Sequence, residues 1–346
     1  MNPTEKMQKC KKWYQENKGL YEVCGETVER LIATLLQEKG ILYHSIGYRV
    51  KAEESFLKKC RNEKYHDPIT QITDMCGLRI IGYTNHDVKQ IRALIEEEFQ
   101  IDAPNSVDKF AQMKDDQVGY LSIHYIATLK EDRARLVEYK RYKNLKFEIQ
   151  IRTMLQHAWA EIEHDRNYKF GGELPSEIKR RFYLVAGTLE MLDREFERLS
   201  DEIDHYAYEV RRETERGNLD EPINSTSLVE YLSIKLKGIE VKGEPFNGKD
   251  KEIILELQAF GIRTLKDLDA IITDQTRAMK SWRQTNFNYL GALRDIMIAH
   301  DPQKYFENVW QRDWIAMDCD SYAEIKRLNP GIQQYVDELE ITSVPD

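Results

Sequence analysis

The stretch Phe147-Glu148-Ile149-Gln150-Ile151-Arg152-Thr153 alternates apolar and polar side chains along its whole length. Because successive residues of a strand point to opposite faces, this period of two predicts a strand with one apolar face and one polar face. The polar face would present a carboxylate, an amide and a guanidinium in a row.

The segment that follows at once changes to helical spacing. Leu155, Trp159 and Ile162 are expected on one apolar face, with His157 and Glu161 on the opposite face. A strand that leads directly into a helix, each with a polar face, is typical of an active-site wall. A half-buried strand with an ordinary charged, solvent-facing side is the competing interpretation.

Composition narrows the class of protein. The chain has 346 residues, enough for two domains, and its net charge of -9 argues against a protein that coats a polyanion over its whole surface. Its five cysteines are odd in number and lack CxxC spacing, which argues against a disulfide framework and a zinc site and favours a reducing cytoplasm. The sequence contains no run of about 18 apolar residues, so no membrane-spanning segment is expected.

Up to about Thr153, strand-like and helical stretches alternate, which predicts an α+β domain with a mixed sheet flanked by helices. The expected strands are Ile41–Val50, Leu78–Tyr83, Tyr120–Leu129 and Leu145–Arg152, and the expected helices between them include Glu53–Lys64 and Val88–Phe99.

A long helix is expected from Pro175 onwards. Its apolar residues follow a heptad pattern: Ile178, Phe182, Val185, Leu189, Leu192, Phe196, Leu199 and Ile203. Such a seam needs a partner, either within its own chain, which we favour because the seam is short, or in a second copy, which would make the protein a homo-oligomer.

Gly217 and Pro222 interrupt this helix, and Asn224 offers an N-cap for a new one. We therefore expect a first domain at residues 1–216 and a mainly helical second domain at residues 217–346. The second domain contains no catalytic motif that we identify, and its tryptophans and tyrosines are interpreted as core residues.

Two segments of the first domain have the chemistry of a polyphosphate site. Arg49 and Lys51 lie at the end of an expected strand, and Ser55 and Lys59 follow at one-turn spacing on the next helix. Cations beside a helix N-terminus hold phosphate oxygens by charge and by backbone N–H groups together. Basic residues at a strand edge also serve solubility, which is the alternative.

Asp74 precedes Gly77 and Arg79 at the start of an apolar strand. A carboxylate in this place is a candidate Mg²⁺ ligand, and an arginine within an apolar strand is costly unless it meets an anion. A structural Arg–Asp pair is the other interpretation.

Two further residues have candidate roles. In Gly119-Tyr120-Leu121-Ser122-Ile123-His124 the glycine lets a ligand approach the backbone, and the ring of Tyr120 offers a surface on which a base can stack. Cross-strand packing explains the tyrosine equally well. Glu148 could bind a metal ion or accept a hydroxyl proton.

Taken together, these motifs resemble the synthetase domain of the RelA/SpoT family over roughly residues 40–170. The helix after Pro175 is similar to the C-terminal helix of the small alarmone synthetases. The resemblance implies a nucleotidyltransferase-like fold that moves the β,γ-pyrophosphate of ATP onto the 3′-hydroxyl of GDP or GTP to make the alarmone (p)ppGpp.

The resemblance also assigns roles by position. ATP would be held by Arg49, Lys51, Ser55, Lys59 and Arg79; Asp74 and Glu148 would be catalytic and would hold Mg²⁺; and the acceptor would contact Tyr120, Ser122, His124, Gln150, Arg152, His157 and Glu161.

Some features depart from the alarmone-making pattern. The approach to the Gly-Tyr motif, Lys114-Asp115-Asp116-Gln117-Val118, is acidic, and residues 155–165 resemble the toxic branch of the small synthetases. That branch pyrophosphorylates the 3′ end of tRNA, and some members carry a C-terminal segment that neutralises the toxin and senses phage. The alternatives are therefore such a tRNA-directed toxin, restrained by residues 217–346 until a trigger protein binds, and a catalytically silent sensor.

A cluster of basic residues before Glu148 could contact a tRNA backbone, with a solvated, charged hairpin as the preferred interpretation. The cluster consists of Arg133, Arg135, Lys140, Arg141, Lys143 and Lys146.

Overall fold

The computed structural model describes residues 3–108, 122–170, 174–239, 241, 244–279, 282, 287–311, 314 and 316–344. Contacts divide the chain into two compact units, Met1–Ser200 and Asp201–Asp346. This division falls inside one long helix, so the helix contributes residues to both units. Among the described helices, none combines the length and the apolar character that a membrane crossing requires.

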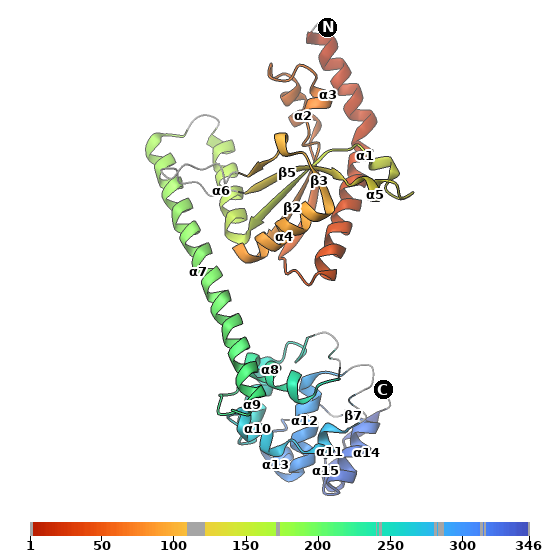
Figure 1. The fold of residues 1–346 in the computed structure, drawn as a ribbon, viewed down its shortest axis with the longest axis vertical. Helices are drawn as coiled ribbons and strands as arrows, with labels where there is room; N and C mark the ends of the chain where they lie inside the picture. The colour runs from red at the N-terminus through yellow and green to blue at the C-terminus, as the bar shows by residue number, and fades with distance from the viewer. Residues whose placement is uncertain are drawn as a thin grey trace. The chain divides into compact units, whose positions relative to one another are not determined.

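The first unit consists of a sheet with helices around it (Figure 1). Its helices are α1 (Pro3–Glu38), α2 (Glu53–Cys60), α3 (Pro68–Gln71), α4 (Asn85–Glu98), α5 (Glu131–Ala134), α6 (Met154–Phe170) and α7 (Ser176–Glu215), with short 3-10 turns at Ala103–Asn105 and Lys140–Tyr142. Its strands are β1 (Ser45–Val50), β2 (Cys76–Gly82), β3 (Phe99–Ile101), β4 (Val107–Asp108), β5 (Ile123–Leu129) and β6 (Phe147–Thr153).

The sheet is mixed, with the order β1-β2-β6-β5 and with β3 and β4 both paired to β5. Only the β2–β6 pair is parallel among these strands. The expected α+β fold with a mixed sheet flanked by helices is confirmed, and the four expected strands are found with ends shifted by up to four residues. The short strands β3 and β4 were not anticipated, because two or three residues carry too little periodicity to be seen.

One face of the sheet carries the core of this unit. Leu78 and Ile80 of β2 stand opposite Ile149 and Ile151 of β6 in the parallel register, and all four are buried. Apolar residues of α1 and α4 complete this cluster. Burying each large apolar side chain stabilises the fold by about 1.5–3 kcal/mol, so this face supplies much of the stability of the sheet. The opposite face is left for polar residues.

Cysteines of α1 lie against the same core. Cys10 hydrogen-bonds with Cys60 of α2, and Cys24 lies near Cys76 of β2. All four are buried as free thiols. Burial raises the pKa of Cys24, Cys60 and Cys76 to about 12.

The long helix α7 packs on the first unit through a face other than its heptad seam. Asp193, which is buried, accepts a hydrogen bond of 2.7 Å from Thr153, and Glu197 pairs with Lys89 of α4 at 2.6 Å. Seam residues such as Phe196 and Ile203 are exposed. The interpretation that the seam packs within its own chain is therefore wrong for these positions, because the polar face of α7 makes the contacts.

The second unit is mainly helical, as expected. Its elements are α8 (Ser225–Lys235), α9 (Asp250–Ala259), α10 (Leu265–Ile271), α11 (Asp274–Arg277), α12 (Tyr289–His300), α13 (Pro302–Asn308), β7 (Ala316–Asp318), α14 (Cys319–Leu328), α15 (Ile332–Glu338) and β8 (Thr342–Val344). Asn224 and Thr264 form the capping boxes that begin α8 and α10.

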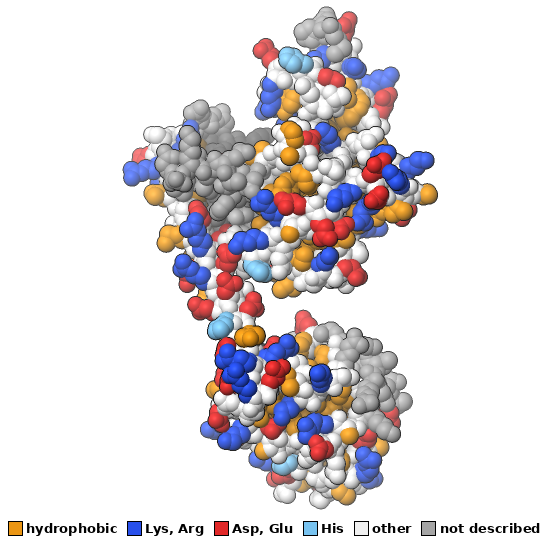
Figure 2. All heavy atoms as spheres, viewed as in Figure 1, with side chains coloured by type: hydrophobic (Ala, Val, Ile, Leu, Met, Phe, Trp, Pro, Cys, Tyr) orange, Lys and Arg blue, Asp and Glu red, His pale blue; other side chains and the backbone are white. Residues whose placement is uncertain are grey.

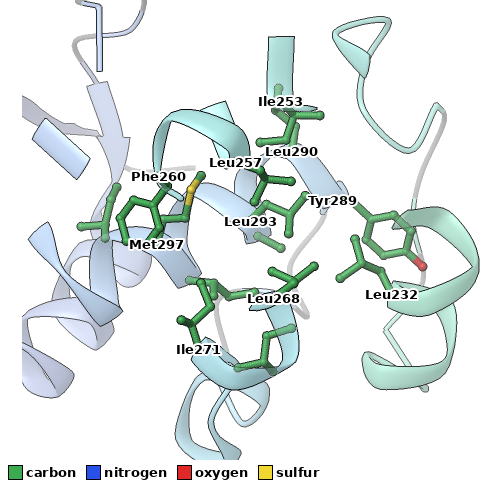
Figure 3. Close-up of a cluster of buried hydrophobic side chains, with 14 of the residues drawn as sticks. Leu232, Ile253, Leu257, Phe260, Leu268, Ile271, Tyr289, Leu290, Leu293 and Met297 are labelled. Carbon is green, nitrogen blue, oxygen red and sulfur yellow. The ribbon is translucent and has the colours of Figure 1, made fainter. Parts of the chain in front are cut away.

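Side chains from α8, α9, α10 and α12 converge in the core of this unit (Figure 3). Leu293 and Met297 of α12 lie at its centre and are fully buried. The helix α12 is buried along much of its circumference, so it is the element around which the others pack.

Candidate active site

The polar face of the first unit's sheet lines a cavity of about 680 Å³. Its walls include these residues expected from the sequence: Arg49, Lys51, Ser55, Asp74, Arg79, Glu148, Gln150, His157 and Glu161. They come from β1, the turn after it, α2, the segment before β2, β2, β6 and α6.

Strand register explains why residues so distant in sequence meet. In the parallel β2–β6 pair Arg79 stands opposite Gln150, and His124 of β5 stands opposite Gln150 on the other side. Residues opposite each other in neighbouring strands share a face of the sheet. The polar positions of three strands are thereby aligned in one row, and α6, which follows β6 directly, adds His157 and Glu161 from one side.

Asp74 forms the acidic centre at the β1 and α2 side of the cavity. Its Oδ2 accepts hydrogen bonds from Lys51 Nζ at 2.9 Å and from Lys59 Nζ at 2.5 Å. Burial of Asp74 acts to raise its pKa, but the two ammonium groups outweigh burial and hold the pKa below its usual value. Asp74 is therefore ionised at neutral pH, with two cations placed beside it.

Glu148 lies at the centre of a chain of side-chain hydrogen bonds. His124 Nδ1 is 2.8 Å from Glu148 Oε1, and Ser122 Oγ is 2.6 Å from His124 Nε2. On the other side Gln150 donates to Glu148 Oε2 at 2.8 Å, and Arg152 donates to Gln150 at 2.9 Å. Burial acts to raise the pKa of Glu148, but the hydrogen bond and charge of His124, together with the bond from Gln150, outweigh burial and hold the pKa below its usual value.

Two guanidinium groups near this chain each have one buried nitrogen to which the described residues offer no acceptor. These are the Nε atoms of Arg79 and Arg152, although Arg79 Nη1 pairs with Glu161 at 2.9 Å. Burial, with the charge of Arg79, lowers the pKa of Arg152. Burial and the same charge lower the pKa of His157. Two close cations with unfilled donors are what an anionic ligand would satisfy.

Arg152 differs from its expected position in one respect. It was expected on an accessible face but is only 8% exposed. The helix α6 packs against β6 and β2 at this end of the sheet and covers it. On α6 itself, Ile162 is 56% exposed and Gln156 is buried instead, so the expected apolar face is wrong there. Gln156 is buried because it bonds Thr153 at the helix start.

His124, Arg152 and Lys59 hydrogen-bond with cavity residues but are not among the walls, and Ser122 hydrogen-bonds with His124. Tyr120 and the acidic approach at residues 114–118 lie outside the described residues, so the expected stacking role stays a prediction. Sequence reasoning did not single out Tyr48, which lines the cavity from β1. Its place beside Arg49 at a strand end was the available signal.

Asp74 and Glu148 are two cavity carboxylates that could hold a magnesium ion together with phosphate oxygens of a ligand. The charge of Asp74 acts to raise the pKa of Glu148. Among the described residues no group of three or more metal-ligating side chains exists. Mg²⁺ is usually bound by one or two carboxylates, substrate phosphates and water, so a pair is sufficient.

Lys59→Met should shift acid unfolding of the first unit to higher pH. The pKa of Asp74 is depressed in the folded state, so its contribution to stability is present above the unfolded pKa and is lost as pH falls through the folded pKa. Removing one ammonium raises that folded pKa, so the loss begins earlier. Thermal melting of both proteins between neutral pH and pH 3 checks this; identical pH profiles would contradict the role given to Lys59.

The basic cluster before β6 is largely neutralised. Arg133 pairs with Glu98, Arg135 and Lys143 both pair with Glu131, and Lys146 pairs with Asp102. Around α5, Lys and Arg side chains are mixed with Asp and Glu on the face in Figure 2. A charged, solvated hairpin accounts for this cluster without a nucleic-acid partner.

Comparison with known proteins agrees with this geometry. Residues 48–173 match the family described as a region found in RelA / SpoT proteins. The GTP pyrophosphokinase YjbM of Bacillus subtilis is 29% identical over 157 residues, which are 45% of this chain and 71% of that protein. The GTP pyrophosphokinase YwaC of the same organism is 26% identical over 160 residues, 45% and 73% of the two chains.

Among solved structures, the small alarmone synthetase 1 from Bacillus subtilis has a TM-score of 0.47 at 25% identity, over 56% of this chain and 98% of that one. The family match identifies residues 48–173 as a region of the kind found in RelA / SpoT proteins. By sequence the chain is similar to the GTP pyrophosphokinases YjbM and YwaC.

Proposed function

We propose that this chain transfers the β,γ-pyrophosphate of ATP to the 3′-hydroxyl of GDP or GTP. The observation that carries the proposal is one cavity lined by two ionised carboxylates and several cations, with Arg152 hydrogen-bonded to Gln150 of its wall. Its relatives YjbM and YwaC are named GTP pyrophosphokinases. Intact chemistry at all these positions argues against a silent sensor.

The donor side of the cavity is the side of β1 and α2. Arg49, Lys51, Ser55, Lys59 and Arg79 supply charge and hydrogen-bond donors for a triphosphate. Asp74 pairs with both Lys51 and Lys59 and offsets part of their charge. A phosphate chain would give both ammonium groups further partners in the positions in which Asp74 holds them. Phosphoryl-type transfer depends chiefly on such positioning and charge neutralisation.

The acceptor side is the side of β5, β6 and α6. The 3′-oxygen attacks the β-phosphorus of ATP, the bond from that phosphorus to the α,β-bridging oxygen breaks, and AMP leaves. Glu148 is ionised and can accept the proton of the 3′-hydroxyl. Its bonds to His124 and Gln150 fix the direction of both carboxylate oxygens, and His124 and Ser122 extend the chain along which the proton can move.

Magnesium would be held by Asp74 and Glu148 together with phosphate oxygens of ATP. When bound, the ion neutralises charge on the transferred group. Both lysines bond the same oxygen of Asp74, Oδ2. The other oxygen, Oδ1, has no bond to these lysines and is the natural ligand.

A free nucleotide is the acceptor that we favour over tRNA. The basic cluster that would follow a tRNA backbone is paired with carboxylates of the same chain. The tRNA-directed alternative, with restraint by the second unit, is instead an outcome of the test.

The test is label transfer by the purified full chain. The protein is given ATP labelled in the γ-phosphate and Mg²⁺, with GDP, GTP or deacylated tRNA in parallel reactions. We expect label on GDP or GTP and release of AMP. Label on tRNA alone would overturn the proposed acceptor but keep the chemistry, and absence of label on all three would overturn the proposed activity.

A further inference from the structure

The second unit contains a cavity of about 280 Å³ of its own. One wall is α12, and other walls come from the residues before it and from β7 and the start of α14. Three aromatic side chains line it: Trp282, Phe287 and Trp314. None of the residues that make up the candidate active site belongs to this unit, so the cavity requires a separate explanation.

A carboxylate, Asp295 of α12, faces this cavity. Trp282 Nε1 donates to its Oδ2 at 2.9 Å, and the Ser321 side chain also hydrogen-bonds with it. Burial raises the pKa of Asp295 to about 7, and the charges of Asp318 and Glu324 add to this effect. An acid is costly in such a place unless a ligand or partner compensates its charge.

The charge balance of the described lining residues is negative. Asp295 and Asp318 both line the cavity. Arg294, which also lines it, directs its guanidinium to two carboxylates of α9, Glu252 at 2.8 Å and Glu256 at 3.0 Å. These two carboxylates offset the charge of Arg294. Carboxylates among aromatic rings are the environment that attracts an organic cation, through ion pairing and cation–π contact together.

We propose that this cavity binds an organic cation, a guanidinium or ammonium group on a short chain, with Asp295 as its counter-ion and the tryptophan rings as its walls. The volume of about 280 Å³ lies just below the range for ligand pockets, roughly 300–1,000 Å³, so it suits a group of side-chain size. The cation has two possible sources: a free small molecule, or an arginine or lysine side chain of a protein that docks here.

Gly291 allows the cavity to be closed without changing Asp295. It lies on the cavity wall in α12, and a Cβ added there would meet only Asn288 Oδ1, at 3.7 Å. Gly291→Leu should therefore fill the space while favouring the helix. Asp295→Asn removes the charge but keeps an acceptor for Trp282. Asp274→Asn is the matched control, because the Asp274 side chain is 95% exposed.

The experiment is calorimetric titration of the full chain with argininamide and, separately, with an arginine peptide blocked at both ends. We expect saturable binding of at least one probe at millimolar concentration or below. Asp295→Asn and Gly291→Leu should each weaken it by about 10- to 100-fold, and Asp274→Asn should not change it. Binding should be stronger at pH 8 than at pH 6 for the parent chain but not for Asp295→Asn.

The two probes distinguish the sources. Tighter binding of the peptide would identify a protein side chain, and equal or tighter binding of argininamide a small molecule. Failure of both probes to bind would overturn the proposal. So would unchanged binding in a folded Asp295→Asn or Gly291→Leu variant. Because the readout is binding to the second unit, it is independent of whether the chain transfers pyrophosphate.

Discussion

Glu148→Gln should lower the rate of pyrophosphate transfer by about 10²- to 10⁴-fold, the range expected when a positioned proton acceptor is lost. The amide keeps the size of the side chain and can still bond His124 and Gln150, so the row of polar residues across the sheet should persist. The variant loses the negative charge that we propose accepts the hydroxyl proton and holds the metal ion.

The measurement is initial-rate label transfer to GDP, with the melting temperature recorded in parallel. Glu138→Gln serves as a control, because Glu138 is exposed beyond the cavity and should keep full activity. A Glu148→Gln protein that transfers label at the parent rate would remove Glu148 from the proposed mechanism. If Glu148→Gln is inactive and also melts far below the parent, its inactivity reflects loss of the fold and says nothing about the role of Glu148. Glu148→Asp then provides the second test.

Asp74→Asn should reduce transfer by at least about 100-fold and raise the Mg²⁺ concentration needed for half-maximal rate. The variant removes one of the two carboxylates proposed for the metal ion, and it also leaves Lys51 and Lys59 without the anion between them. The shift in Mg²⁺ dependence separates a metal-binding role from a purely structural one.

Asp132→Asn is the matched control for this second variant, because Asp132 is exposed on α5 and has no place in the cavity. The structural alternative, in which Asp74 only neutralises the lysines, makes a different prediction. Under it, the double variant with Lys59→Met would regain much of the lost rate. Recovery of that kind, with unchanged Mg²⁺ dependence, would overturn the metal-site assignment.

Much of the candidate site was predictable because period-two patterns survive in strands that are buried on one face. Phe147, Ile149 and Ile151 are all buried, and Glu148 and Gln150 face the cavity, as the alternation indicates. Registers between strands could not be predicted in the same way. Nothing local to His124 states that it will stand opposite Gln150, since pairing is decided by the whole sheet.

The helices show where local patterns fail. The seam of α7 has regular heptad spacing, yet a different face of the helix contacts the first unit. On that face Asp193 bonds Thr153 and Glu197 pairs with Lys89. Similarly, Gln156 displaces Ile162 from the protected side of α6 through its bonds to Thr153. In both places a specific hydrogen bond from a distant or preceding residue outweighs apolar periodicity.

The boundary expected at residue 217 and the contact division after Ser200 differ because α7 continues without interruption to Glu215. Gly217 does end the helix region, with a φ of 82° in the left-handed region that favours glycine. A glycine in the sequence indicates where a helix ends. Packing determines which turns of the helix belong to the core of which unit. Val210, for instance, is buried in the core of the second unit.

The buried thiols of α1 can report local opening of the first unit through their rate of chemical labelling. Only a thiolate reacts rapidly with an alkylating reagent, and burial raises the pKa of Cys24 to about 12. While α1 is packed on the sheet, Cys24 should therefore be almost inert at neutral pH. Cys319 is partly exposed and can serve as an internal reference for the reagent. The labelling rate of Cys24 then reports how often α1 separates from the sheet. It measures the free energy of local opening of the helix that packs on the apolar face, opposite the cavity.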